Sequence, residues 1–82
     1  MTPKLPRDLS GQRLARALAA FGYTVTRQTG SHLRLTTSLN GEHHVIIPDH
    51  GQLEAGTLPA ILGEIARHLE TSKDELASRL FG

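Results

Sequence analysis

The chain has 82 residues, of which 38% are hydrophobic and 21% are charged, as is typical of a small globular domain. A chain of this size buries only about 60% of the surface that it exposes when unfolded, which excludes a deep cavity for a large cofactor. It contains no cysteine, so disulfides, thiolate metal sites and cysteine nucleophiles are excluded as well. We therefore expect a single domain over residues 1–82.

The net charge of +1 conceals an uneven distribution along the chain. Residues 1–41 hold six basic residues and one acidic residue, a net of +5, whereas residues 42–82 hold three basic and seven acidic residues, a net of −4. A basic half can attract a polyanion such as nucleic acid. An ordinary mixed surface explains the same numbers, so charge leaves both interpretations open.

We expect neither a membrane span nor a secretion signal from this sequence. No apolar run approaches the roughly 20 residues that a bilayer-spanning helix requires. The start, from Met1 to Pro6, lacks the apolar stretch of a signal peptide. We expect a cytoplasmic protein with no membrane partner.

The first predicted element is an amphipathic helix. Residues 1–8 contain two prolines and predict an irregular lead-in, after which Ser10 predicts the N-cap. Apolar residues at spacings of four and three form the core-facing stripe of this helix, which consists of Leu14, Leu18 and Phe21. Gly22 predicts the end of the helix, because glycine readily adopts the left-handed backbone conformation that is common there.

Three strands joined by short turns are predicted next, over residues 23–28, 32–37 and 42–47. Gly30 lies in the first turn, and the dipeptide Asn40-Gly41 is a strong signal for the second. Pro48 predicts the end of the third strand, because proline has no amide hydrogen to donate to a strand partner.

Side chains alternate across a strand, which sorts the residues of each strand onto two faces. In the first strand, Tyr23 and Val25 are expected on one face, and the other face is expected to carry Thr24, Thr26 and Gln28. In the middle strand, Leu33 and Leu35 are expected to face the core. The face turned away from the core then carries His32, Arg34 and Thr36.

Two helices are predicted after a polar loop over residues 49–56. Thr57 is expected to cap the first of them, Pro59 fits its first turn, and its apolar stripe consists of Leu58, Ile61, Leu62, Ile65 and Leu69. Ser72 starts a short C-terminal helix over residues 72–82, since Glu75 completes a capping-box pattern. The predicted fold class is therefore α+β, an α-β-β-β-α domain with a three-stranded antiparallel sheet plus this C-terminal helix. Double-stranded-RNA-binding domains have the same order of elements, which is an analogy of fold alone.

The tripeptide Gly30-Ser31-His32 is the strongest candidate for a site of chemistry. Gly30 permits a tight turn, so His32 begins a strand and points away from the core. An imidazole titrates near about pH 6.5, so it can accept the proton of a ribose 2′-hydroxyl or donate one to a leaving oxygen. Arg34 lies on the same predicted face and could hold the phosphate. Periodicity alone does not favour catalysis, because an exposed histidine at the end of a strand is common.

The remaining histidines give weaker signals. His43 and His44 are adjacent on a strand and face opposite sides, so they cannot easily share a metal ion. Neither cysteine ligands nor an HExxH pattern accompanies them, and we expect no metal and no cofactor. His50 follows the third strand and is a candidate second acid or base, if the fold brings it close to His32. Aromatic residues are scarce, and no aromatic platform for stacking bases is visible.

Several short segments resemble, in their order and spacing, the HicA-type (YcfA-like) toxins of bacterial toxin–antitoxin pairs. These segments are Ser10-Gly11, Phe21-Gly22-Tyr23, Arg27 to His32, Pro48-Asp49-His50, Gly56-Thr57-Leu58 and Ile61-Leu62. The resemblance covers nearly the whole chain, from Leu9 to Leu80. It implies the double-stranded-RNA-binding-like α-β-β-β-α fold.

The resemblance also implies a function and a partner. Proteins of this family are metal-independent endoribonucleases (mRNA interferases) that cut messenger RNA and halt translation, and their catalytic histidine follows Gly-Ser, which is His32 here. The implied partner is a HicB-type antitoxin that covers the active face. We predict that His32 is catalytic, that His50 is the candidate second acid or base, and that RNA is bound by Arg27, Ser31, Arg34, Arg13 and Arg16.

Two other interpretations remain at this point. The same fold could bind structured RNA without cutting it, because the net charge is modest and no second catalytic group is certain. Alternatively, the chain could be an inactive relative that mainly binds an antitoxin-like protein, an interpretation that the acidic second half favours.

Overall fold

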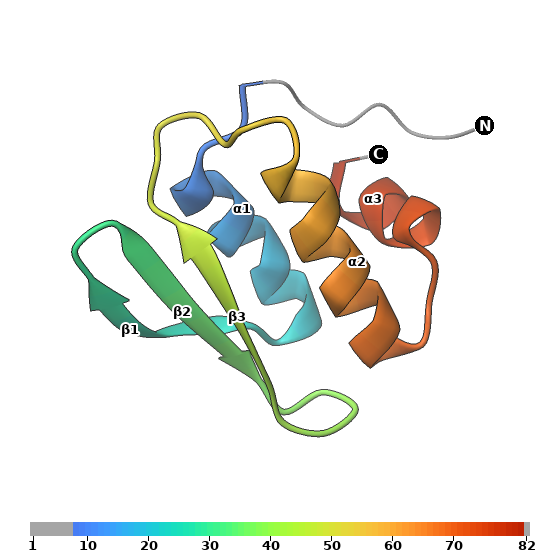
Figure 1. The fold of residues 1–82 in the computed structure, drawn as a ribbon. Helices are drawn as coiled ribbons and strands as arrows, with labels where there is room; N and C mark the ends of the chain where they lie inside the picture. The colour runs from blue at the N-terminus through green and yellow to red at the C-terminus, as the bar shows by residue number, and fades with distance from the viewer. Residues whose placement is uncertain (1–7, 82) are drawn as a thin grey trace.

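The computed structural model describes residues 8–81, in which three α-helices lie on one side of a three-stranded sheet (Figure 1). The elements are α1 (Gly11–Leu18), the 3₁₀ helix η1 (Ala19–Phe21), β1 (Thr24–Thr29), β2 (His32–Thr37), β3 (His43–Pro48), α2 (Thr57–Leu69) and α3 (Lys73–Phe81). This order confirms the predicted α+β class with its α-β-β-β-α arrangement. The predicted lead-in over residues 1–8 lies outside the described residues, apart from Asp8.

The sheet is an antiparallel meander in the order β1-β2-β3, as predicted. Two residues, Gly30 and Ser31, join β1 to β2, and the φ of Gly30 is 51°. Glycine suits this place because the first central position of a type II′ hairpin turn requires a positive φ. In the turn between β2 and β3, Asn40 and Gly41 have φ values of 57° and 96°. Both turns therefore lie where the sequence predicts them.

The core lies between the sheet and the helices α1 and α2. Leu33 and Leu35 of β2 are 1% and 0% exposed, as the predicted alternation requires. They belong to one cluster with the apolar stripes of the two helices, which include Leu14, Leu18, Leu62 and Ile65. All helices pack on this side, so the side of β2 that carries His32 and Arg34 has no helix over it (Figure 1).

The first strand departs from the predicted alternation. The register between β1 and β2 shifts after Val25, because a β-bulge inserts one extra residue into β1. Beyond the bulge, Arg27 pairs with Arg34, and Gln28 pairs with the buried Leu33. Gln28 therefore faces the same side as Val25, and its predicted place on the opposite face is wrong. The bulge also turns Arg27 to the side that carries Arg34.

The ends of the first two helices test the capping residues that the sequence predicts. The Ser10 hydroxyl accepts a hydrogen bond from the Arg13 amide at 3.1 Å, which confirms the predicted N-cap of α1. Gly22 takes a left-handed φ of 80° after η1, as predicted. Thr57 is not the cap of α2: Gly56 occupies that position without a side-chain bond, and Thr57 is the first helical residue.

The C-terminal helix α3 packs against α2 and places Leu76 in the core, where it is 0% exposed. The Ser72 hydroxyl accepts a hydrogen bond from the Glu75 amide at 3.0 Å, so the predicted cap of this helix is confirmed. The Glu75 carboxylate bonds Arg79 instead of completing the capping box. No helix within residues 8–81 is long and apolar enough to cross a membrane.

Candidate nucleic-acid interface and active site

The open face of the sheet is the side turned away from the helices. The register places on it Thr24, Thr26, Arg27 and Thr29 of β1, His32, Arg34 and Thr36 of β2, and His44, Ile46 and Pro48 of β3. None of these strand residues is acidic. The open face therefore offers cationic and hydrogen-bonding groups to a ligand without a strand carboxylate among them.

His32 lies at one end of the open face, at the first position of β2. It pairs with Thr29 across the turn and with Pro48 of β3. Its side chain is exposed, and no side chain or backbone group of residues 8–81 forms a hydrogen bond with it. The imidazole can therefore exchange a proton with a bound molecule without first breaking a contact within the described part of the chain.

Two arginines adjoin His32 on the open face. Arg34 follows it by two residues on β2, and the bulge sets Arg27 directly opposite Arg34. Like charges at directly opposed positions destabilise a pair of strands. Within residues 8–81 neither guanidinium meets a carboxylate, whereas Arg79 on α3 binds a glutamate at 3.2 Å. The pair is therefore suited to a phosphate group, which would accept hydrogen bonds from both guanidinium groups and offset their repulsion.

His50 and Ser31 lie at the same end of the sheet as His32. The Asp49 amide donates to the Ser31 carbonyl at 2.7 Å, and the Gly11 amide donates to the His50 carbonyl at 3.0 Å. These bonds hold the start of the 49–56 loop between the β1–β2 turn and the beginning of α1. The backbone therefore brings His50 to the end of the sheet at which His32 lies.

Asp49 is a positioning residue that sequence reasoning missed. Its two carboxylate oxygens accept hydrogen bonds from the side-chain amide of Gln12 at 3.1 Å and from that of Gln28 at 3.2 Å. The contacts join α1, β1 and the loop after β3. Because the partners are 37 and 21 residues away in sequence, no local pattern could have revealed them.

Gly11 allows the start of α1 to approach the end of β3. A Cβ atom at this position would overlap the carbonyl oxygen of Pro48. Only glycine permits so close an approach of two backbones. Gly11 therefore fixes the segment that leads from Pro48 to His50.

Arg13 and Arg16 lie apart from the residues around His32. Both are exposed on α1, and α1 packs on the covered side of the sheet. Of the predicted RNA-binding residues, the structure brings those of the strands and of the β1–β2 turn together with His32. It does not bring the two arginines of α1 to the open face.

Comparison with models of protein families assigns the chain to a family. The model for the HicA toxin of bacterial toxin–antitoxin systems matches residues 11–67, which are more than half of the chain. The chain belongs to the HicA toxin family. Searches of curated proteins and of solved structures find no significant match. The matched span contains the whole sheet and His32.

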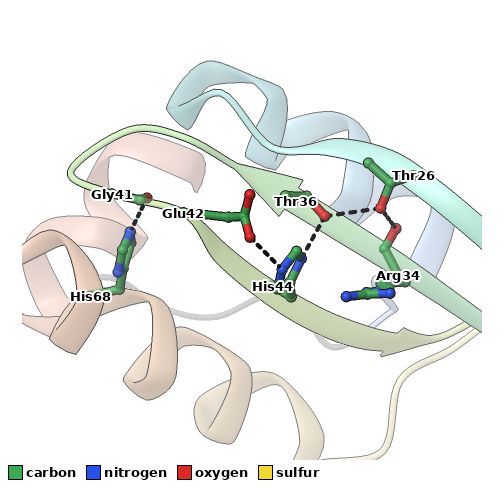
Figure 2. Close-up of polar contacts among 7 residues, drawn as sticks. All are labelled: Thr26, Arg34, Thr36, Gly41, Glu42, His44 and His68. Carbon is green, nitrogen blue, oxygen red and sulfur yellow. Dashed lines mark hydrogen bonds and ion pairs between the residues drawn. The ribbon is translucent and has the colours of Figure 1, made fainter.

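A chain of hydrogen bonds occupies the other end of the open face of this HicA toxin (Figure 2). One carboxylate oxygen of Glu42 is 3.2 Å from Nε2 of His44, and Nδ1 of His44 is 2.8 Å from the Thr36 hydroxyl. The Thr36 hydroxyl is 2.9 Å from that of Thr26, which donates to the Arg34 carbonyl at 3.3 Å. The chain holds the ring of His44 at both nitrogens, in contrast to the exposed ring of His32. Sequence analysis did not foresee it, because its members come from different strands.

His43 faces the covered side of the sheet, as its place beside His44 predicts. The Tyr23 hydroxyl is 2.8 Å from Nδ1 of His43, whose ring stacks on that of His68 with 4.3 Å between centroids. Burial lowers the pKa of His43, and the nearby His68 lowers it further. Burial also raises the pKa of Tyr23 to about 12, and the carboxylate of Glu64 adds to that shift.

His68 joins the end of α2 to the turn between β2 and β3. Its Nε2 donates to the carbonyl oxygen of Leu39 at 2.9 Å and to that of Gly41 at 3.0 Å, the second of which Figure 2 shows. In return, the side-chain amide of Asn40 donates to the His68 carbonyl at 2.8 Å. Within residues 8–81 no group of three or more His, Cys, Asp or Glu side chains is arranged to hold a metal ion.

Proposed function

We propose that this HicA-family toxin is an endoribonuclease that cleaves messenger RNA on its open face, in the cytoplasm, and thereby blocks translation. One observation carries the proposal. His32 is exposed and has no partner among residues 8–81, and it stands beside two arginines that meet no carboxylate there. A proton acceptor next to a phosphate-binding pair is the arrangement that RNA cleavage requires.

His32 is the proposed general base. Its imidazole removes the proton of a ribose 2′-hydroxyl, and the resulting oxygen attacks the adjacent phosphorus atom. The bond from phosphorus to the 5′-oxygen of the next nucleotide breaks, which leaves a 2′,3′-cyclic phosphate and a 5′-oxygen that needs a proton. We assign this proton to the imidazolium of His50, at the same end of the sheet. The route then requires neither a metal ion nor a cofactor.

The arginines of the open face are proposed to bind the reacting phosphate. Arg27 and Arg34 present fixed donors to a group whose negative charge grows as the phosphorus is attacked, which favours the transition state. Ser31 is exposed in the turn before His32 and can donate its hydroxyl to the same phosphate. Arg13 and Arg16 would serve RNA that extends around the sheet toward α1.

The partner of the toxin is proposed to be a HicB-type antitoxin. Membership in the HicA toxin family supports a toxin–antitoxin pair. An antitoxin that covers the open face would exclude RNA from His32. This arrangement explains how a cell could tolerate the nuclease.

The test compares the wild type with His32→Ala on synthetic single-stranded RNA, with a chelator present throughout. The wild type is expected to yield fragments that end in a 2′,3′-cyclic phosphate, and the variant is expected to yield none. His32→Gln serves as a matched control, because it keeps a polar side chain but cannot act as a base near neutral pH. Cleavage that survives both substitutions would refute the assignment of His32.

The same experiment in a bacterial host without the antitoxin follows growth and message length. Growth arrest with shortened messages for the wild type alone supports the proposal. RNA that is bound but never shortened by the wild type would instead select a non-catalytic RNA-binding module of the same fold. Tight binding of an antitoxin without any binding of RNA would select an inactive antitoxin-binding subunit.

A further inference from the structure

Ile46 is a large apolar side chain on the open face, and it belongs to the edge strand β3. It is 53% exposed, more than Leu39 at 50% and Val25 at 48%, the other exposed large hydrophobic residues of the described chain. On β3 it pairs with Arg34, and Pro48 follows it by two residues on the same face. β3 therefore contributes an apolar strip to the open face.

The open face is divided lengthwise into two parts of different chemistry. The Arg27–Arg34 pair makes the β1–β2 side cationic, whereas Ile46 and Pro48 make the β3 side apolar beyond His44. Neighbouring strands are about 4.8 Å apart, so the two parts are separated by little more than one strand. A nucleotide has the same two parts, an anionic phosphate and a flat base with apolar faces, at a comparable separation.

From this division we infer that the open face binds an unpaired RNA strand, with its phosphates over Arg27 and Arg34 and a base packed against Ile46. The inference rests on the proposed function and names the substrate class of that site. In a duplex the bases are stacked on one another, and the A-form helix presents mainly phosphates and 2′-hydroxyls. Ile46 could then meet no base, so the apolar strip selects an unpaired strand. Protein sheets that bind unpaired nucleic acid use their exposed faces in this way, usually with aromatic side chains.

The length of the open face determines how an RNA strand can lie along it. The His44–Thr36 pair lies four residues along β2 from His32, which is about 13 Å at roughly 3.3 Å per residue. His44 and His32 therefore lie at opposite ends of the open face, with Arg34 midway between them along β2. An RNA strand that runs along β2 therefore places at His44 a nucleotide next to the one at the cut.

The groups at the far end favour a base over a phosphate. The carboxylate of Glu42 lies beside His44 and would repel a phosphate, whereas it can accept a hydrogen bond from the amino group of a base. Both ring nitrogens of His44 are held (Figure 2), and His44 precedes Ile46 by two residues on the same face of β3. His44 is thus a positioning residue for the base, and the proposed acid–base pair of His32 and His50 acts on the cut at the opposite end of the sheet.

The test uses oligonucleotides with a single cleavable ribonucleotide, beginning with a dinucleotide and extended one nucleotide at a time on either side of the cut. The wild type is expected to gain about fivefold or more in kcat/KM when a base on one side reaches Ile46, in line with the size of single-base contacts. In Ile46→Ser this gain from extension is expected to disappear. Val25→Ser is the matched control, because Val25 is similarly exposed but shares the side of Leu35 and lies off the open face.

A substrate with an abasic sugar at the extended position distinguishes the contribution of the base from that of the sugar–phosphate backbone. The wild type is expected to lose the same factor with the abasic substrate as with Ile46→Ser, and the two changes together are expected to lose no more than either alone. A wild type that cuts the dinucleotide as fast as the longest substrate would overturn the inference while leaving the proposed nuclease intact. Independent, additive losses would also overturn it.

Binding measurements keep the test decisive if the wild type cuts nothing, which would be a failure of the proposed function instead. Fluorescence anisotropy of the same oligonucleotides with His32→Ala reports the gain from extension without cleavage. Loss of that gain in the double variant His32→Ala/Ile46→Ser supports the inference. An Ile46→Ser variant that binds every oligonucleotide normally but weakens the antitoxin complex would identify Ile46 as a protein contact and overturn it.

Discussion

On the covered side of the sheet His43 is bonded by Tyr23 and stacked on His68, whereas on the open face His32 has no partner within residues 8–81. Both residues are histidines on strands of the same small sheet. Their surroundings give them different roles, because a ring that is bonded and stacked stabilises the fold, whereas an exposed ring can exchange protons. The hydrogen-bond partners of the two histidines thus distinguish a ring that the fold holds from one that a ligand can reach.

His44 lies between these two extremes. It belongs to the open face, but Glu42 and Thr36 hold both of its ring nitrogens. We therefore propose it as a residue that positions a ligand. The adjacent pair His43 and His44 thus contributes one residue to the fold and one to the interface, as strand alternation requires.

The largest expected effect comes from removing the exposed ring. His32→Ala should lower kcat/KM for RNA cleavage by about 10²–10⁴-fold, the usual contribution of a general base. The free energy of unfolding should change by no more than about 0.5 kcal/mol, because the side chain is exposed and has no partner in the described chain. Cleavage assays and urea unfolding measure the two quantities. A variant with full activity, or one that is inactive because it is unfolded, would break the comparison.

The next effect comes from removing the bonded ring. His43→Ala should lower the free energy of unfolding by about 1–3 kcal/mol, because it leaves the buried Tyr23 hydroxyl without its partner. The cleavage rate per folded molecule should be unchanged. The double variant Tyr23→Phe/His43→Ala should be less destabilised than the sum of the two single variants. A loss of activity at full folding would contradict the structural role of His43.

A smaller effect is expected from the arginines that face each other across β1 and β2. Arg27→Ala or Arg34→Ala should weaken binding of all RNA sequences alike and reduce the slope of log affinity against log salt by about 1. Arg79→Ala is the matched control, because Arg79 is paired with Glu75 on α3 and should leave the slope unchanged. Binding isotherms between about 50 and 200 mM salt provide the measurement. Equal salt slopes for the wild type and all variants would contradict a phosphate site at Arg27 and Arg34.

The smallest effect is the pH dependence of stability. Burial lowers the pKa of His43 in the folded protein, so the unfolded chain binds a proton first as the pH falls below about 6.5. Stability should therefore decrease as the pH falls through this value and level off below the folded pKa. His43→Gln should flatten that decrease in urea unfolding between about pH 7.5 and 5.5. A wild type that becomes more stable over the same range would contradict the sign.

Tyr23 is expected to affect the stability of the fold at high pH. Its pKa is raised from 10.0 to about 12, so the unfolded chain loses the phenolic proton first as the pH rises. Stability should therefore fall between these two values, and Tyr23→Phe should remove this loss.

Much of the fold could be predicted because its signals are local. The alternation of Leu33 and Leu35 was sufficient to predict that His32 points away from the core. Gly30 and Gly22 likewise mark a turn and the end of a helix. The bulge in β1 could not be foreseen, since one extra residue changes no composition. It nevertheless decides on which face Arg27 lies.

The candidate site was only partly visible in the sequence. The motif before β2 and the family resemblance predict that His32 is catalytic, which stays a prediction, whereas family membership is confirmed. The supports of the site were missed because they connect distant segments, such as the contacts of Asp49 with Gln12 and Gln28. The cap of α2 was misplaced by one residue, because Thr57 is a good capping residue whose side chain is not used in that way.

Chemical rescue tests the central claim most directly, because it separates the proton acceptor from every structural role of His32. Imidazole is added to His32→Ala with single-stranded RNA, and cleavage is compared with that by imidazole alone and by imidazole with His43→Ala. We predict that imidazole restores cleavage by His32→Ala above the protein-free background, in proportion to its unprotonated form. No restoration, although the variant is folded and binds RNA, would contradict the assignment of His32 as the base.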